Sequence, residues 1–231
     1  MKPILELRDI TFGYEDRLLF QGLNLSIPRG RRLGLMGPNG IGKTTLLRLI
    51  VGLIKPLEGE IVYKGRSCRS EADFRWLRRE VGLVFQDPDD QLFCPTVAED
   101  IAFGPLNLGL PRKEVKRIVR QTLALLGLEG FEDRVTYRLS GGEKRLVALA
   151  TVLAMSPKIL LLDEPTGDLD AQNTEKLLNI LPRLTAAQLI VSHDLEFLQA
   201  VTDEIWWLED GRLRPLPSGF WVTSHLKIAQ G

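Results

Sequence analysis

Residues 37–44 have the composition and spacing of a loop that holds phosphate groups. The pattern G-x-x-x-x-G-K-[ST] is filled, in order, by Gly37, Pro38, Asn39, Gly40, Ile41, Gly42, Lys43 and Thr44. The glycines allow the backbone to curl until consecutive N–H groups face phosphate oxygens. In this pattern the lysine reaches the β- and γ-phosphates, and the threonine hydroxyl binds Mg²⁺. The loop predicts a nucleotide site but does not separate kinases, GTPases and motor ATPases; the N-K-x-D motif of GTPases is absent from the sequence.

Two adjacent acids, Asp163 and Glu164, follow a short apolar run at residues 159–162. Such a run is typical of a buried strand in a parallel sheet, and ligands bind at the carboxyl edge of these sheets. We expect Asp163 to hold Mg²⁺ through water and Glu164 to polarise the water that attacks the γ-phosphate. An isolated Asp-Glu pair is more often a solvated turn, so this interpretation depends on the phosphate loop in the same chain.

Two further segments have the right composition for contact with phosphate. His193 follows an apolar strand candidate and could tie the γ-phosphate to Glu164, although a lone histidine is commonly a surface or core residue. Ser140, Gly141 and Gly142 open an apolar helix, which gives either an ordinary N-cap or a second anion site. Because one nucleotide needs one cradle, a second cradle suggests a nucleotide shared with another copy of the chain.

The elements that position these residues can be traced from hydrophobic periodicity. Strands are expected at 4–12, 23–27, 33–36, 159–162 and 188–192, and a hairpin at 205–216 around Asp210-Gly211. Helical faces occur at 46–53, 115–126 and 146–153. Strands alternate with helices at both ends, and a helix-rich block occupies about 96–155. The pattern therefore predicts an α/β core with a helical insertion.

Composition narrows the class of protein. Of 231 residues, 44% are hydrophobic and the formal net charge is +0, which argues against binding nucleic acid mainly by electrostatics. The two cysteines have no metal-ligand spacing and are expected to be free thiols. No apolar run approaches the roughly 20 residues that span a bilayer. A role at a membrane would therefore need a partner that crosses it.

Taken together, the motifs resemble those of the ATP-binding cassette (ABC) ATPases, in that family's order and over nearly the whole chain. Tyr14 stands where the family stacks an aromatic residue on adenine. The remaining matches are the Walker A loop (37–44), the Q-loop Gln86, the signature 139–143, Walker B Asp163-Glu164, the D-loop 167–170 and the switch histidine in 192–194.

The resemblance implies one ABC ATPase domain over residues 1–231 that binds ATP and Mg²⁺. Its fold would be α/β, a P-loop NTPase (RecA-like) core (1–95 and 156–231) with an antiparallel β subdomain and an inserted α-helical signature subdomain (about 96–155). Catalytic roles fall to Lys43, Gln86, Glu164 and His193, and Mg²⁺ contacts to Thr44, Gln86 and Asp163. Nucleotide contacts fall to Tyr14, the loop through Thr45, and Ser140, Gly141, Gly142 and Glu143; dimer contacts fall to Asp168 and Asp170.

Two residues depart from the family pattern. Glu143 stands where the signature usually ends in glutamine, which places an acid near a polyphosphate. Asp168 stands where the D-loop more often has a small residue, which changes contacts across the dimer. Neither change removes a catalytic group.

A narrower resemblance lies in residues 84–105, which are similar to the importers of the energy-coupling-factor type, particularly the cobalt, nickel and biotin members. In that group the region after the Q-loop forms a groove for a helix of the membrane coupling subunit. Leu92 and Phe93 suit such a contact, although either residue could pack in the core instead.

The resemblance thus implies a peripheral ATPase on the cytoplasmic face of the cell membrane, powering import of cobalt or nickel ions. Its partners would be a second copy or a paralogous ATPase, the coupling subunit and a substrate-binding membrane subunit, with no nucleic acid. The alternatives are import of biotin or another vitamin, export, and a soluble ABC ATPase of DNA repair or translation. This last class normally carries long insertions or a second cassette, which are missing here.

Overall fold

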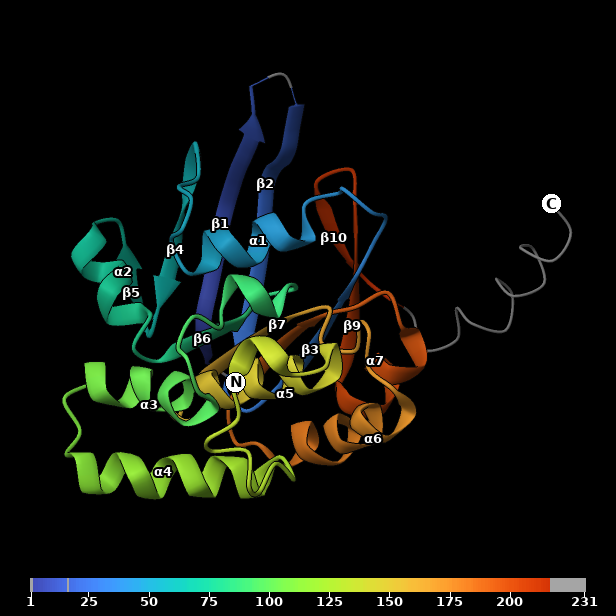
Figure 1. The fold of residues 1–231 in the computed structure, drawn as a ribbon. Coiled ribbons are helices and arrows are strands. Elements are labelled where there is room, and N and C mark those ends of the chain that lie inside the picture. The colour runs from blue at the N-terminus through green and yellow to red at the C-terminus, as the bar shows by residue number, and fades with distance from the viewer. Residues whose placement is uncertain (1, 16, 217–231) are drawn as a thin grey trace, which may run out of the picture.

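The structure is a computed structural model that describes residues 2–15 and 17–216. Expectations for residues 1, 16 and 217–231, including the end of the predicted core, lie outside the described residues. Within them, the chain forms two sheets and seven α-helices, arranged as Figure 1 shows.

The larger sheet is predominantly parallel. Its order is β10 (Arg212–Pro215), β9 (Glu204–Glu209), β3 (Arg32–Met36), β8 (Ala187–Val191), β7 (Ile159–Asp163) and β6 (Val81–Val84). Only β10 is antiparallel to its neighbour. The predicted hairpin between β9 and β10 is confirmed. Asp210 and Gly211 both have positive φ, the conformation of a two-residue type I′ turn.

The smaller sheet is antiparallel, as the resemblance implies. Its order is β2 (Arg17–Pro28), β1 (Pro3–Tyr14), β4 (Glu58–Tyr63) and β5 (Arg66–Cys68). Both β1 and β2 are longer than the sequence alternation predicts. Their register shifts at several points, and such irregularities interrupt the two-residue period on which the prediction rests.

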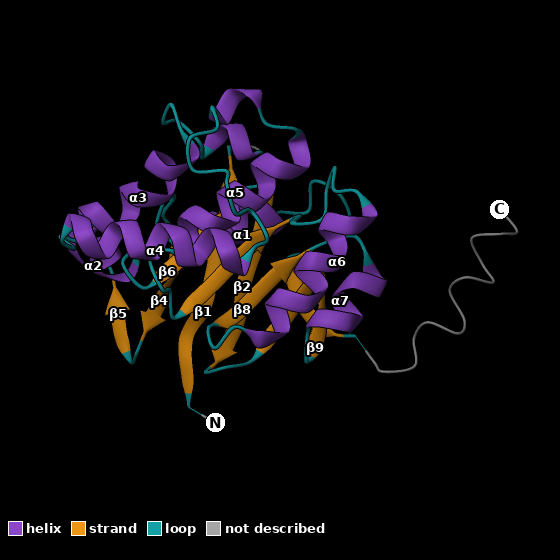
Figure 2. Cartoon of the chain, turned by 60° about the horizontal axis from the view of Figure 1, so that its bottom comes forward, coloured by secondary structure: helices purple, strands orange, loops and turns teal. Residues whose placement is uncertain are grey.

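The helices are α1 (Lys43–Ile50), α2 (Glu71–Leu77), α3 (Val97–Asn107), α4 (Arg112–Leu125), α5 (Gly141–Leu153), α6 (Ala171–Ile180) and α7 (Leu195–Val201). Helices α3 to α5 fall within the block predicted to be helical, and α3 packs on both α4 and α5. Figures 1 and 2 place α3 and α4 on one side of the molecule and α6 and α7 on the other. The boundaries at 95 and 156 stay a prediction.

The carboxyl ends of four parallel strands meet at one edge of the larger sheet. Val84 of β6 lies beside Leu162 of β7, and Asp163 lies beside Val191 of β8. Leu35 of β3 also pairs with Val191. The segments that leave these strands therefore emerge together, at Gly37, Phe85, Glu164 and Ser192. This register, rather than nearness in sequence, assembles the candidate site.

None of the described helices combines the length and the apolar character needed to cross a bilayer. Cys68 is buried and Cys94 half-buried, and both are free thiols.

Candidate active site

The loop between β3 and α1 uses glycine where a side chain would not fit. Gly42 has a φ of +110°, and a Cβ there would lie 2.8 Å from the ring of Phe20. A Cβ on Gly37 would lie 2.4 Å from the carbonyl oxygen of Leu208. The loop backbone is therefore pressed against neighbouring strands, which fixes its path into the helix.

Lys43 is held inside this loop. Its Nζ donates to the carbonyl oxygens of Gly37, at 2.7 Å, and Pro38, at 3.1 Å. Burial lowers the pKa of Lys43, while the charges of Glu164 and Asp163 oppose this shift. The ammonium group thus lies among phosphate-loop carbonyls and two acids, as a group that neutralises phosphate charge must.

Asp163, at the end of β7, is a buried acid with spare acceptor capacity. It is 3% exposed, and its Oδ1 has no hydrogen-bond partner among the described residues. Burial raises the pKa of Asp163, and the charge of Glu164 adds to this effect. The hydroxyl of Thr44 and the charges of Arg48 and Lys43 act in the opposite direction. An unpaired carboxylate oxygen near a threonine hydroxyl fits a hard divalent cation such as Mg²⁺.

Glu164 and His193 meet across the sheet edge. His193 Nδ1 lies 2.9 Å from Glu164 Oε2, and the backbone N–H of His193 donates to the same oxygen at 3.3 Å. Because a carboxylate only accepts, Nδ1 carries the proton of this contact. Glu164 has a φ of +49°, a left-handed conformation that is costly for glutamate and that clusters at active sites. This turn directs the acid away from β7 and toward His193.

Lys43, Asp163 and Glu164 line one cavity of about 570 Å³, whereas His193 is not among its lining residues. The residues that line it are Tyr14, Arg17, Leu19, Asn39, Gly40, Gly42, Lys43, Thr44, Thr45, Gln86, Asp163 and Glu164. Nine of the predicted nucleotide or metal contacts and the predicted catalytic Glu164 are thus brought together. Gly37 and Pro38 turn carbonyls to Lys43 instead, and Ile41 lines a neighbouring hollow of about 300 Å³. Arg17 and Leu19 were not predicted, because they reach the cavity only through the pairing of β2 with β1.

A family profile described as "ABC transporter" matches residues 20–167. The chain belongs to the ABC transporter family. A Brucella suis protein whose name places it among ABC transporter ATP-binding proteins is 52% identical over 215 residues, which are 93% of this chain and 90% of the relative. The energy-coupling factor transporter ATP-binding protein EcfA of Methanothermobacter thermautotrophicus is 43% identical over 91% of this chain and 69% of its own length.

Two solved structures agree in fold. CbiO1 from Clostridium perfringens, part of the ABC transporter complex CbiONQ, has a TM-score of 0.83 at 34% identity, over 93% of this chain and 88% of its own. The dimeric post-hydrolysis structure of the ATP-binding cassette MJ0796, bound to ADP and Pi, has a TM-score of 0.84 at 28% identity, over 92% of this chain and 97% of its own. These relatives confirm the P-loop fold, the resemblance to energy-coupling-factor ATPases, and hydrolysis of ATP with Mg²⁺ as its partner ion.

The ABC signature lies at the start of α5 and outside the cavity of its own chain. Ser140 caps the helix, accepting from the N–H of Glu143 at 3.3 Å. The carboxylate of Glu143 accepts from the Ser140 N–H at 2.8 Å and from Arg134 at 2.9 Å. The Ser140 backbone contact and Arg134 hold the pKa of Glu143 below its usual range despite partial burial. Glu143, which replaces the usual glutamine of the signature, therefore forms a capping box with Ser140.

The two D-loop acids have different local roles. Asp170 caps α6 by accepting from the N–H of Asn173 at 2.7 Å. Asp168 has a φ of +56°, and its Oδ2 lies 3.3 Å from Arg145 of α5. Their predicted contacts with a second chain stay predictions.

In the segment after Gln86, Leu92 and Phe93, the two residues predicted to contact a partner helix, have different environments. Leu92 is buried in the core that contains α3 and α5, whereas Phe93 is 66% exposed. Phe93 stacks edge to face on Phe103 of α3, with ring centroids 4.8 Å apart. Of the pair, only Phe93 offers an apolar surface to a partner.

Proposed function

We propose that this ABC ATPase powers an energy-coupling-factor type importer on the cytoplasmic face of the membrane, carrying cobalt or nickel ions. The observation that carries the proposal is the segment that links the ATP cavity to an exposed aromatic patch. Gln86 lines the cavity, and Phe93 is exposed seven residues later. A change around the γ-phosphate is thus delivered, through a short connection, to a surface that suits an apolar helix.

In the proposed reaction, the residues around the cavity divide the work. Lys43 would neutralise the β- and γ-phosphates, while Thr44, Asp163 and Gln86 would hold Mg²⁺. Bound Mg²⁺ supplies positive charge against the charge that develops on the phosphates. Glu164 accepts hydrogen bonding from the attacking water and orients it. His193, held to Glu164 through Nδ1, keeps this acid in place, and its largely exposed ring would leave Nε2 available for the γ-phosphate.

We infer that the site is completed by a second cassette, either another copy or a paralogous ATPase. Ser140 to Glu143 carry a helix N-terminus suited to phosphate, yet they do not line the cavity of their own chain. Head-to-tail pairing would bring the signature of one chain onto the phosphates held by the other. Asp168 and Asp170 would then lie at the junction. The dimeric state of the MJ0796 cassette supports pairing of two chains.

Gly141→Ala tests the shared site without disturbing the fold. Gly141 is exposed, nothing lies within 4 Å of the position of its Cβ, and its φ is one that alanine adopts. The melting temperature should therefore be preserved. Because the methyl group would stand over the N–H groups proposed to bind phosphate, ATP-dependent pairing should weaken at least about tenfold, or ~1.4 kcal/mol. Light scattering with Glu164→Gln as background measures this. Unchanged pairing would exclude a contact at Gly141.

The docking surface consists of Phe93, Phe103 and Leu106, which are 66%, 46% and 46% exposed. The exposed acids Asp87 and Asp90 lie on the connection that precedes it. An amphipathic helix with a basic residue beside its apolar face is complementary to this combination. A membrane coupling subunit that presents such a helix, together with a substrate-binding membrane subunit, would complete the importer.

Uptake of radiolabelled nickel and cobalt ions tests both the docking surface and the cargo. Cells in which this chain carries Phe93→Ser should lose most uptake, because the apolar contact is removed, while the purified variant keeps its ATPase activity. Leu125→Ser, at a 49% exposed position on α4, is the matched control and should transport normally. Uptake of biotin instead of the metals would redirect the proposal to vitamins. Loss of ATPase activity in purified Phe93→Ser would contradict a docking role.

A further inference from the structure

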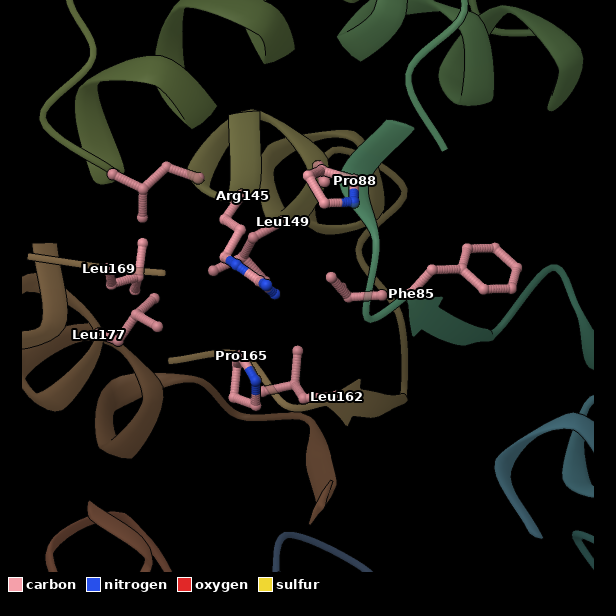
Figure 3. A pocket seen from close by; sticks show the side chains of 11 residues that line it. Phe85, Pro88, Arg145, Leu149, Leu162, Pro165, Leu169 and Leu177 are labelled. Carbon is pink, nitrogen blue, oxygen red and sulfur yellow. The ribbon is translucent and has the colours of Figure 1, made fainter. Parts of the chain in front are cut away.

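Arg145 lies in the first turns of α5, where the signature helix faces two loops of the catalytic core, the loop after β6 and the loop between β7 and α6. Figure 3 shows its guanidinium extending from α5 into the space between Phe85 and Pro165. The side chain is only 12% exposed. The sequence gives no signal for this role, because all its partners are distant along the chain.

The guanidinium contacts three groups in these two loops. Nη1 donates to the carbonyl oxygen of Gln86 at 2.8 Å and to that of Glu164 at 3.1 Å. Nη2 donates to Oδ2 of Asp168 at 3.3 Å. A planar fork with five donors can serve these acceptors together, which a single ammonium group cannot do with the same geometry.

Arg145 is packed against apolar side chains on one side and faces an open cavity on the other. The cavity on the apolar side has a volume of only about 10 Å³, and apolar side chains such as Phe85, Leu162 and Pro165 line it. Water has little room on this apolar side, where the partly buried bond to the Glu164 carbonyl lies. On the other side, Arg145, Gln86 and Asp168 line a cavity of about 420 Å³. Glu164 also has a φ of +49°, which is unfavourable for a residue with a side chain. The hydrogen bond from Arg145 to the Glu164 carbonyl oxygen therefore stabilises this backbone conformation.

We propose that Arg145 is a positioning residue that fixes the backbones of Gln86 and Glu164 and ties the D-loop to the signature helix. The proposal rests on the functions given above to Glu164 and Gln86. It also accounts for Asp168: an acid at this D-loop position provides the carboxylate that Arg145 binds. Movement of α5 during pairing is then transmitted directly to the acid that orients water.

The same helix is attached to the post-Gln86 segment by other contacts. Lys144 Nζ lies 2.6 Å from Asp89, and Gln91 Nε2 donates to the Ala148 carbonyl at 2.7 Å. Removal of the Arg145 guanidinium should therefore leave α5 docked and displace the backbones locally. This separates positioning from a general role in folding.

Steady-state ATP hydrolysis and nucleotide binding by Arg145→Met in the full chain test the proposal. Because a displaced catalytic acid costs up to about a hundredfold in rate, kcat should fall about 10- to 100-fold. The Kd for ATP should change by less than about threefold, since no phosphate contact is removed. Arg78→Met is the matched control: Arg78 donates to the Val51 carbonyl at 3.0 Å and pairs with Glu71, away from the cavity. It should lower stability comparably and keep kcat.

Two further variants decide the outcome even if Arg145→Met folds poorly. Arg145→Lys retains the positive charge but has a single donor nitrogen in place of the planar fork, and it should recover kcat only in part. Asp168→Asn should lower kcat modestly in the wild-type background and have no additional effect beside Arg145→Lys, because their contact is already lost. Wild-type kcat in Arg145→Lys, or full additivity with Asp168→Asn, would overturn the proposal. A wild-type chain without ATPase activity would instead contradict the catalytic roles on which the proposal rests.

Discussion

Replacing Glu164 by glutamine should reduce ATP turnover about 10²- to 10⁴-fold, the usual contribution of a positioned general base. The amide keeps the size of the carboxylate and an oxygen that accepts from His193 Nδ1, which now lies 2.9 Å from Glu164 Oε2. It can no longer draw a proton from water. Lys43 and the loop glycines are untouched, so ATP binding should persist. The variant should therefore accumulate as an ATP-bound pair of chains.

Phosphate release and light scattering, measured on the same sample, provide the two readouts. Glu129→Gln, at an exposed position remote from the cavity, is the matched control and should behave as the wild type in both. Turnover at the wild-type rate in Glu164→Gln would remove Glu164 from the mechanism. Loss of turnover without a lasting dimer would keep Glu164 as the base but contradict the shared site.

The parts of the fold that sequence predicts are those set by local periodicity. The apolar face of α4 was predicted from 3.6-residue spacing, and its Val115, Val119, Thr122 and Leu123 are buried. The β9–β10 hairpin was predicted from Asp210-Gly211, since both positions need positive φ. By contrast, β5 has three residues and β6 has four, which is too short for a reliable alternation.

The candidate site likewise contains residues that local sequence patterns predict and residues that only the tertiary structure brings in. Lys43 and Thr44 belong to one local sequence pattern and Asp163 and Glu164 to another, so all four are visible in sequence. Arg17, Leu19 and Arg145 reach their positions through strand pairing or helix docking, and no local sequence pattern marks them. Leu92 and Phe93 are adjacent and both apolar, yet one is buried and the other exposed, because the turn after Gln91 directs only Leu92 toward α3 and α5.

Asp163→Asn should abolish most ATPase activity and at the same time stabilise the nucleotide-free chain. Folding raises the pKa of Asp163, chiefly by burial, so the folded chain binds this proton more tightly than the unfolded chain. The ionised carboxylate therefore lowers stability as pH rises through the folded pKa. Its Oδ1 has no hydrogen-bond partner among the described residues, so little compensates the cost of burying the negative charge.

The neutral amide of Asp163→Asn removes the negative charge next to Glu164. Lys43 still interacts with Glu164 and donates to the carbonyls of Gly37 and Pro38, so its own charge stays compensated. At pH 8 without Mg²⁺, the melting temperature should rise by roughly 2–8 °C, from about 1–2 kcal/mol in a chain of this size. The difference should shrink as the pH is lowered toward the ordinary range of aspartate, where the wild-type carboxyl becomes protonated. Asp133→Asn, at an exposed position, should show no such trend.

Mg²⁺ and ATP should reverse the order of stability. The wild type gains binding energy from the Asp163 carboxylate, and the asparagine variant gains less, because a neutral amide is a weaker ligand for a hard cation. Melting curves at two pH values, with and without Mg²⁺ and ATP, give the complete comparison. If Asp163→Asn were less stable than the wild type under every condition, the buried carboxylate would be a structural acceptor. That result would contradict the proposal that the Asp163 carboxylate lowers the stability of the free chain and serves to bind Mg²⁺.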